Sequence, residues 1–286
     1  MQGEGVESSR TGSEGEGCAA RAYPTVSSLP TDRYRHVYVS PHFDDVALSA
    51  GGTLLGQVRH EGCLVVAVCT ARPPGAVSEF AEYQHDRWGG AADPWAEREE
   101  EERRAMAALG ADYLWLGLPD AIYRGEQYLS DEDLFGPVQP GDAPVAAALA
   151  AAVRDLAERQ EGATFYLPLG VGGHVDHQLC FDLTAPLLAS GHAVLLYEDV
   201  PYALAPTEVE RRLHEVARTT RLTLEPEISE IGDLIGEKCR AADLYASQIP
   251  WIFRHYGPAE QSLRRHAASL SRENGYAERF WRPRDD

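Results

Sequence analysis

Short apolar runs alternate with longer amphipathic stretches along most of the chain, beginning near residue 35. The short runs are typical of buried strands, and the stretches in which apolar residues recur about every three to four positions are typical of helices. The predicted strands are Arg35–Val39, Cys63–Thr70, Tyr113–Leu116, Thr164–Leu167 and Ala193–Tyr197. The predicted helices are Asp44–Arg59, Pro94–Leu109, Ala143–Arg159, Asp176–Leu188, Ile231–Ser247 and Pro258–Leu270. This alternation predicts an α/β fold, a single domain with a Rossmann-like parallel sheet and helices on both faces.

The segments outside these elements differ in composition. Residues 1 to about 30 are rich in Gly, Ser and Glu, so we expect a disordered tail before a domain that spans residues 31–286. Two long connections, Ala71–Asp93 and Pro119–Asp142, are expected to form the rim of a substrate pocket, because connections of this length are commonly functional. Their aromatic residues either stack on the faces of a sugar or cover small satellite cores; they include Tyr83, Trp88, Tyr123 and Tyr128.

Two polar motifs follow two of the predicted strands. Ser40–Asp45 comes after the first strand, and Gly172–His177 comes after the strand at Thr164–Leu167. Because ligands of open α/β sheets bind beyond the carboxyl ends of the strands, we expect the two motifs to meet at that edge. The chain has no GxGxxG fingerprint, so the fold is not expected to bind a dinucleotide through such a loop.

The two motifs together can build a metal site. His42, Asp45 and His177 supply two imidazoles and one carboxylate, which is among the commonest ligand sets of a catalytic zinc ion. Asp44 and His174 lie beside these residues in the sequence and can handle protons next to a metal-bound water. The same ligand set also occurs in non-haem Fe(II) oxygenases, but those usually have all-β scaffolds, which the strand and helix pattern here does not predict.

Charge and cysteine content restrict the partners. The formal net charge of −19 argues against a nucleic-acid-binding surface and against adhesion to anionic membranes, so a neutral or cationic small molecule fits better. The five cysteines are scattered without CxxC spacing, which is typical of reduced core residues. No apolar stretch resembles a secretion signal or a membrane span, so we expect a cytoplasmic protein, and a homo-oligomer is left open.

The motifs resemble those of the PIG-L (LmbE-like) family of zinc-dependent N-deacetylases. The family's first motif, His-Pro-Asp-Asp, is similar to His42-Phe43-Asp44-Asp45, and its second, His-x-Asp-His, is similar to His174-Val175-Asp176-His177. Weaker similarities extend the resemblance over about residues 35–250; they include Arg98 with Glu101, Leu116–Asp120, Tyr197–Tyr202, and Lys238 to Gln248.

The resemblance implies a role for each matching residue. It implies Zn²⁺ bound by His42, Asp45 and His177, with Asp44 as the general base and His174 as an acid or electrostatic stabiliser. It also implies that polar residues of the pocket bind the substrate, for which the candidates are Arg98, Asp120 and Tyr202. The implied reaction is removal of an acetyl group from an N-acetylglucosaminyl-type sugar on a specialised metabolite or another small glycoside.

Some positions depart from the family pattern. Phe43 and Val175 replace the usual prolines, and Gly172 stands where some members have a tyrosine, so that the oxyanion role of that tyrosine falls to Tyr202 or His174 or is omitted. Asp176 is placed to orient an imidazole. Arg98, Asp120, Glu198 and Asp199 either contact the substrate or belong to structural ion pairs. The sequence also leaves open an amidase that cleaves a thiol S-conjugate or another small amide, and a non-catalytic module that binds metal or sugar.

Overall fold

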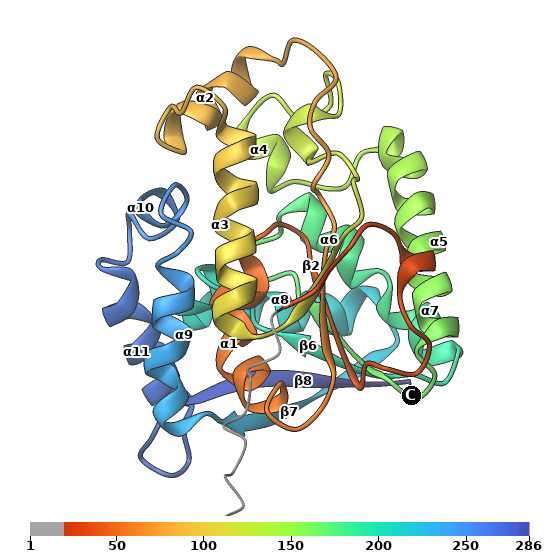
Figure 1. Cartoon of the computed structure of the whole chain (residues 1–286), viewed down its shortest axis with the longest axis vertical. Coiled ribbons are helices and arrows are strands. Elements are labelled where there is room, and N and C mark those ends of the chain that lie inside the picture. Colours follow the sequence, from red (N-terminus) through yellow and green to blue (C-terminus); the bar gives the residue numbers. More distant parts are fainter. Residues whose placement is uncertain (1–19, 286) are drawn as a thin grey trace, which may run out of the picture.

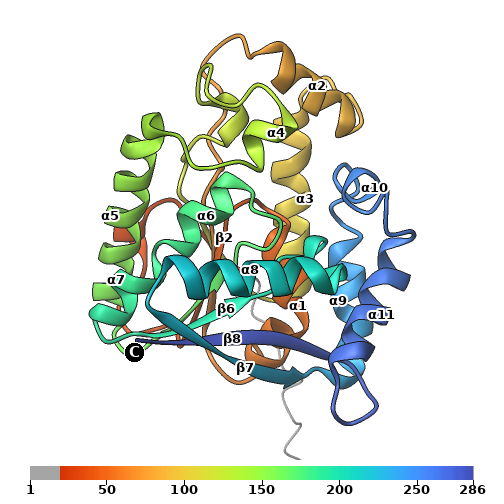
Figure 2. The same ribbon diagram turned by 180° about the vertical axis from the view of Figure 1, so that it is seen from behind.

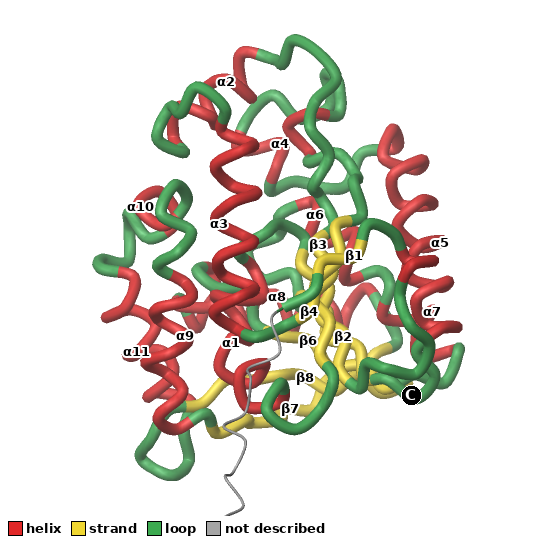
Figure 3. The backbone as a smooth tube through the Cα atoms, in the orientation of Figure 1, coloured by secondary structure: helices red, strands yellow, loops and turns green. Residues whose placement is uncertain are grey.

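A mostly parallel, eight-stranded sheet forms the centre of the protein in the computed structural model, which describes residues 20–285 (Figures 1 and 3). The strand order is β1-β4-β3-β2-β5-β6-β8-β7, and β8 is antiparallel to both of its neighbours while the other pairs are parallel. The strands are β1 Ala22–Tyr23, β2 His36–Ser40, β3 Cys63–Ala67, β4 Asp112–Trp115, β5 Thr164–Pro168, β6 Ala193–Tyr197, β7 Leu222–Glu230 and β8 Ala277–Asp285.

The central strands are buried on both faces, which explains why they read as continuous apolar runs. All five residues of β3 are buried. In β2, Val37 and Val39 pack into one apolar cluster and Tyr38 packs into the cluster on the opposite face, as the alternation of side chains along a strand requires. The two clusters are the cores between the sheet and its two helical layers.

Helices cover both faces of the sheet, as Figures 1 and 2 show from opposite sides. Most apolar side chains of α1 Asp45–Gln57 and α3 Pro94–Leu109 belong to one cluster, and most of those of α5 Ala143–Arg159, α6 Val175–Phe181, α7 Thr184–Ala189 and α8 Pro206–Thr219 belong to the other. Helix α9, Ile235–Ala242, packs on α1 and α3, and its Ile235, Cys239 and Ala242 belong to a third, smaller cluster. Helix α11, Ala259–Leu270, packs beside α9 and β8. The predicted fold class is therefore confirmed.

Local chemistry sets the helix ends that the sequence predicts well. Helix α3 spans Pro94–Leu109 as expected, because Asp93 caps its N-terminus by accepting from Ala96 N at 2.9 Å and Gly110 ends it in the left-handed region, with φ at 70°. The expected helix Asp176–Leu188 is instead divided into α6 and α7. Pro186 has no N–H to donate to the carbonyl of Asp182, so the first helix ends one turn earlier.

Other elements differ from the prediction. The helix expected at Ile231–Ser247 is shorter and consists of a 3₁₀ turn, Gly232–Leu234, followed by α9. The first long connection contains α2 Glu79–Arg87, and the second contains the short helix α4 Asp131–Leu134. The edge strand β7, its neighbour β8, the helix α8 and the short helix α10, Ile249–Ile252, were not predicted.

The start of the domain also lies earlier than residue 31. Ala22 and Tyr23 form β1 and pair with β4, and Leu29 is buried in the core, so residues 20–30 belong to the fold rather than to the expected tail. Residues 1–19 lie outside the part of the chain that the structure describes. Within residues 20–285 no helix is long and apolar enough to cross a membrane. Cys63, Cys69, Cys180 and Cys239 are buried and free, and Cys18 lies outside the described residues.

Candidate metal centre and active site

The two polar motifs meet at the carboxyl ends of neighbouring strands. Strand β2 pairs with β5, so the loop that follows Ser40 lies beside the loop that follows Pro168. Asp45 is the first residue of α1, and His177 lies in the first turns of α6. The sheet topology therefore brings together residues that are about 130 positions apart in the chain.

Two imidazoles converge on a single carboxylate oxygen of Asp45. Oδ2 of Asp45 lies 3.3 Å from Nδ1 of His42 and 3.4 Å from Nε2 of His177, and the three ligand atoms all lie within 4.8 Å of one another. Burial alone would raise the pKa of Asp45, but the charge of His177 and the hydrogen bond with His42 hold it well below its ordinary value. The donor set is therefore one anionic oxygen and two imidazole nitrogens, which can hold a divalent ion and leave a position open.

Carboxylates behind the two imidazoles set their orientation. Oδ1 of Asp199 lies 2.6 Å from Nδ1 of His177, which leaves Nε2 free to face Asp45. Asp199 is itself held by the backbone N–H of Val171, which donates to Oδ2 at 2.8 Å. On the other side, Oδ2 of Asp176 lies 3.2 Å from Nε2 of His42. Each histidine thus presents the nitrogen that its carboxylate partner does not occupy.

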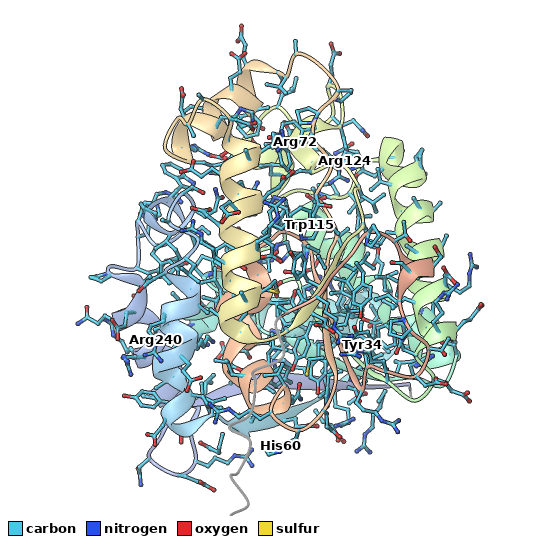
Figure 4. All side chains as sticks on the ribbon, in the orientation of Figure 1. Tyr34, His60, Arg72, Trp115, Arg124 and Arg240 are labelled. Atoms are coloured by element: carbon cyan, nitrogen blue, oxygen red, sulfur yellow. The ribbon has the colours of Figure 1, made fainter. Side chains whose placement is uncertain are left out.

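Arg124 extends this buried network away from the metal centre. Its guanidinium contacts Oδ1 of Asp176, and its Nη1 lies 2.9 Å from Oδ2 of Asp142. The hydroxyl of Tyr128 donates to the same Asp142 oxygen at 2.6 Å. Figure 4 shows Arg124 above the sheet, between α3 and α5. Because Asp176 is engaged by Arg124 and by the N–H of Ala121 at 3.1 Å, it is better suited to orienting His42 than to binding metal, although His42, His174 and Asp176 also lie within ligand distance of one another.

Asp44 and His174 have electrostatic surroundings that suit acid and base chemistry. Asp44 is buried, and desolvation, followed by the charge of Asp45, raises its pKa to about 6 in spite of the opposing charge of Arg98. Burial lowers the pKa of His174 well below its ordinary value, so its imidazole is neutral near pH 7. Nδ1 of His174 accepts from the N–H of Asp176 at 3.2 Å, which leaves the proton on Nε2.

All eight residues predicted from the sequence line one pocket of about 320 Å³. They are His42, Asp44, Asp45, Arg98, Asp120, His174, His177 and Tyr202. Within the described residues, Nε and Nη1 of buried Arg98 have no hydrogen-bond partner, and its guanidinium lies 4.4 Å from the ring centroid of Trp88. Asp120 is more constrained than the sequence suggested, because its Oδ1 accepts from Ile122 N at 3.2 Å and its Oδ2 lies 3.6 Å from Nε2 of His42.

Glu198 and Asp199, whose roles the sequence also left open, have different contacts. Asp199 orients His177, whereas Glu198 accepts from Trp281 Nε1 at 2.9 Å and from Arg279 Nε at 2.5 Å, both on β8. Glu198 therefore belongs to a structural network. The contacts of Asp199 and Arg124 were not predicted, because each depends on a loop that meets the motifs only in the folded chain. The sequence signals for Asp199 are its position two residues after the predicted strand Ala193–Tyr197 and its place in the segment Tyr197–Tyr202 that resembles the family.

The two long connections contribute to the pocket wall, as expected. The first supplies Gln84, Arg87 and Trp88, and the second supplies Asp120, Ile122, Asp131, Leu134 and Phe135. The four aromatic residues considered from the sequence divide between the two alternatives. Trp88 lines the pocket, while Tyr128 is fully buried in a satellite core that Tyr123 also contacts, and Tyr83 is half-exposed.

Comparison with known proteins agrees with this geometry. The family model PIG-L, GlcNAc-PI de-N-acetylase, matches residues 37–188, more than half of the chain. A 2'-N-acetylparomamine deacetylase of Streptomyces fradiae is 34% identical to this chain over 223 residues, which cover 76% of this chain and 74% of the relative. A 2'-N-acetylparomamine deacetylase of Niallia circulans is 29% identical over 60% of this chain and 68% of the relative. The zinc-inhibited form of teicoplanin deacetylase shares the fold, with a TM-score of 0.74 at 21% identity, over 88% of this chain and 98% of the other. The protein is therefore a hydrolase that belongs to the PIG-L family of de-N-acetylases.

Proposed function

We propose that the protein is a zinc-dependent hydrolase that removes the acetyl group from an N-acetylglucosaminyl-type sugar carried by a specialised metabolite or another small glycoside. The observation that carries the proposal is the oxygen of Asp45 that faces both His42 Nδ1 and His177 Nε2 on the pocket floor, with Asp44 beside it. Membership of the PIG-L family and the N-acetylated aminoglycosides named for the curated relatives support the same reaction.

The donor set fits zinc. His42, Asp45 and His177 would hold the ion, because two imidazoles and one carboxylate, each oriented from behind by other side chains, are the ligands of an open catalytic zinc site. When bound, zinc supplies Lewis-acid activation of a water molecule and of the amide carbonyl. The amide bond is then cleaved by direct attack of water, with no covalent bond between enzyme and substrate.

The remaining side chains of the pocket transfer protons, stabilise negative charge and bind the sugar. Asp44 takes a proton from the attacking water and passes it to the nitrogen of the departing amine, and its raised pKa places it close to the range in which a group that accepts and returns a proton is most effective. Neutral His174 and the phenol of Tyr202, whose pKa burial raises, keep their protons and can donate hydrogen bonds to the oxygen of the former carbonyl as negative charge develops there. Arg98, with two unsatisfied N–H groups, is placed to bind sugar hydroxyls.

The proposal is tested by metal analysis and by mass spectrometry of reaction products. We expect about one zinc ion per chain in purified protein and the loss of one acetyl group from N-acetylglucosaminyl glycosides incubated with it. A matched set of N-acyl sugars and small thioether amides separates a sugar deacetylase from an amidase of thiol conjugates. Hydrolysis of the amides with no turnover of any acetylated sugar would contradict the proposed substrate class.

A further inference from the structure

The outer part of the pocket is walled by three segments that lie far apart in the sequence. Helix α2 contributes Arg87, α4 contributes Asp131, and α10 with the turn after it contributes Trp251 and Arg254. In Figures 1 and 2, α2 and α4 lie beyond the strand ends and α10 lies beside α3. Trp251 and Arg254 lie outside residues 37–188, to which the family model is matched. The wall is therefore built from residues outside the two polar motifs, and part of it lies outside the region matched by the family model.

Three of these side chains, Arg87, Trp251 and Arg254, form a stack with Tyr83 of α2, and we call these four residues the mouth stack. The guanidinium carbon of Arg87 lies 4.1 Å from the ring centroid of Tyr83 and 4.1 Å from that of Trp251, and the guanidinium carbon of Arg254 lies 3.7 Å from that of Trp251. Such cation–π contacts hold both guanidinium groups against the indole and reduce their freedom before any ligand arrives.

The two arginines of the mouth stack differ in how their charge is used. Arg87 binds Asp131 with two parallel hydrogen bonds, at 2.8 Å to Oδ1 and 3.0 Å to Oδ2, and its side chain is only 10% exposed. Arg254 is exposed, and its Nη1 donates to the carbonyl of Trp251 at 2.7 Å. Across residues 20–285, no carboxylate oxygen lies within 4.0 Å of a nitrogen of Arg254. Arg254 thus keeps a positive charge and free donors at the mouth.

The carboxylates that line the pocket offset that charge only in part, because Asp131, which feels the charge of Arg254, is already paired with Arg87. Asp44, Asp45 and Asp120 belong to the metal centre at the floor, and Asp131 is bound by Arg87. The net charge of −19 would by itself favour a neutral or cationic molecule, but charges more than about 8 Å away are largely screened at physiological ionic strength. The arginines that line the pocket therefore decide which charge is preferred at its mouth.

We propose that the mouth stack is an outer subsite that binds a carboxylate or phosphate group on the part of the substrate beyond the N-acetylated sugar. Arg254 donates hydrogen bonds to the anionic group, and the Trp251 ring holds the Arg254 guanidinium in place. The guanidinium of Arg87, on α2, packs against the same ring. The inference rests on the proposed deacetylase function. It makes the preferred substrate of this enzyme anionic at its outer end, in contrast to the aminoglycoside named for the curated relatives.

The test uses alkyl glycosides of N-acetylglucosamine whose chains end in a carboxylate, a hydroxyl or an ammonium group, prepared at two chain lengths. The readout is kcat/KM for release of acetate. We expect the carboxylate series to exceed the hydroxyl series by about five- to tenfold and the ammonium series to be the poorest, with the differences shrinking as salt is added. Equal rates for the three end groups, or a preference for ammonium, would overturn the subsite.

Charge-reversal variants make the test specific. Arg254→Gln should abolish the preference for the carboxylate series over the hydroxyl series, and Arg254→Glu should invert it in favour of the ammonium series. Arg211→Gln is the matched control, because Arg211 is an exposed arginine on α8 that pairs with Glu208 outside the pocket, and it should keep the preference. Failure of every glycoside to lose acetate would count against the deacetylase function itself. Turnover without a charge preference that depends on Arg254 would count against the subsite alone.

Discussion

The ring of Tyr202 occupies the space that a side chain at position 172 would need. A Cβ atom on Gly172 would lie 2.4 Å from Cγ of Tyr202, and Gly172 has a φ of 87°, in the left-handed region that favours glycine. A tyrosine from a different loop thus fills the space beside Gly172, so that only a residue without a side chain fits at position 172. The phenol of Tyr202 lines the pocket, with its ring centroid 6.5 Å from that of His177.

This arrangement predicts that Tyr202 supplies an oxyanion donor. Tyr202→Phe should lower kcat by about 100-fold, the usual cost of removing one such donor, with little change in KM or zinc content. Gly172→Ala should also lower kcat, because the new methyl group displaces the Tyr202 ring. Full activity of the Phe variant would leave His174 as the remaining candidate for this role.

A second prediction separates metal binding from proton transfer. Asp45→Ala and His177→Ala should lose zinc, because each removes one of only three ligands, and activity should fall with the metal. Asp44→Asn should keep zinc and lose about 100-fold or more in kcat, since it removes only the base. Zinc content by elemental analysis and steady-state kinetics on the same preparations distinguish the two effects. Parallel loss of metal and activity in Asp44→Asn would make Asp44 a ligand.

A third prediction concerns the carboxylate behind His177. Asp199→Ala should weaken zinc affinity by about 10- to 100-fold, because the imidazole loses the partner that fixes its tautomer and ring orientation. The affinity is measured by competition with a chelator. The neighbouring variant Glu198→Gln is the control: it disturbs contacts with Arg279 and Trp281, so it should lower the melting temperature and leave zinc affinity unchanged. Equal zinc affinities in the two variants would show that Asp199 acts only through stability.

The sequence predicts the parts of the fold whose determinants are local. Helices α3 and α5 match their predicted ranges, because an N-cap and a glycine bound the first and a stripe of Leu149, Val153 and Leu156 faces the core in the second. The central strands were found because they are buried on both faces. The rule that ligands of open α/β sheets bind beyond the carboxyl ends of the strands was enough to expect the motifs of His42 and His177 to meet.

The parts that were missed depend on contacts between distant segments. Strand β7 is mostly polar and only Leu222 is buried, and it is stabilised by pairing with β8, whose residues lie 47 to 63 positions away in the chain. Arg124 belongs to no motif, and the similarity at Tyr197–Tyr202 does not say what Asp199 does, so the role of each follows from the carboxylate or histidine that it contacts. The mouth stack likewise joins α2 to α10, and no local sequence pattern indicates that these two helices lie close together.

The last prediction concerns Glu102, a carboxyl group buried beneath the active site. Its side chain is fully buried, Oε1 has no hydrogen-bond partner in the described part of the chain, and Oε2 accepts from the hydroxyl of Tyr245 at 2.6 Å. Desolvation, reinforced by the charge of Asp44 and opposed by the Tyr245 hydrogen bond and by Arg98, raises its pKa from 4.5 to about 8. The folded protein therefore keeps a proton on Glu102 at pH values where the unfolded chain has released it.

The sign of the effect on stability follows from this difference in bound protons. Because the folded-state pKa of Glu102 lies above the unfolded-state value, its contribution is complete below pH 4.5 and is lost as the pH rises toward about 8. Because glutamine does not ionise, Glu102→Gln should not lose stability in this way. Its free energy of unfolding should exceed that of the parent by a few kcal/mol at pH 8, and this difference should shrink toward pH 5. Urea unfolding across this range measures it, with Glu100→Gln, an exposed position on the same helix, as the control. A constant offset between parent and Glu102→Gln at every pH would mean that Glu102 is already ionised in the folded protein.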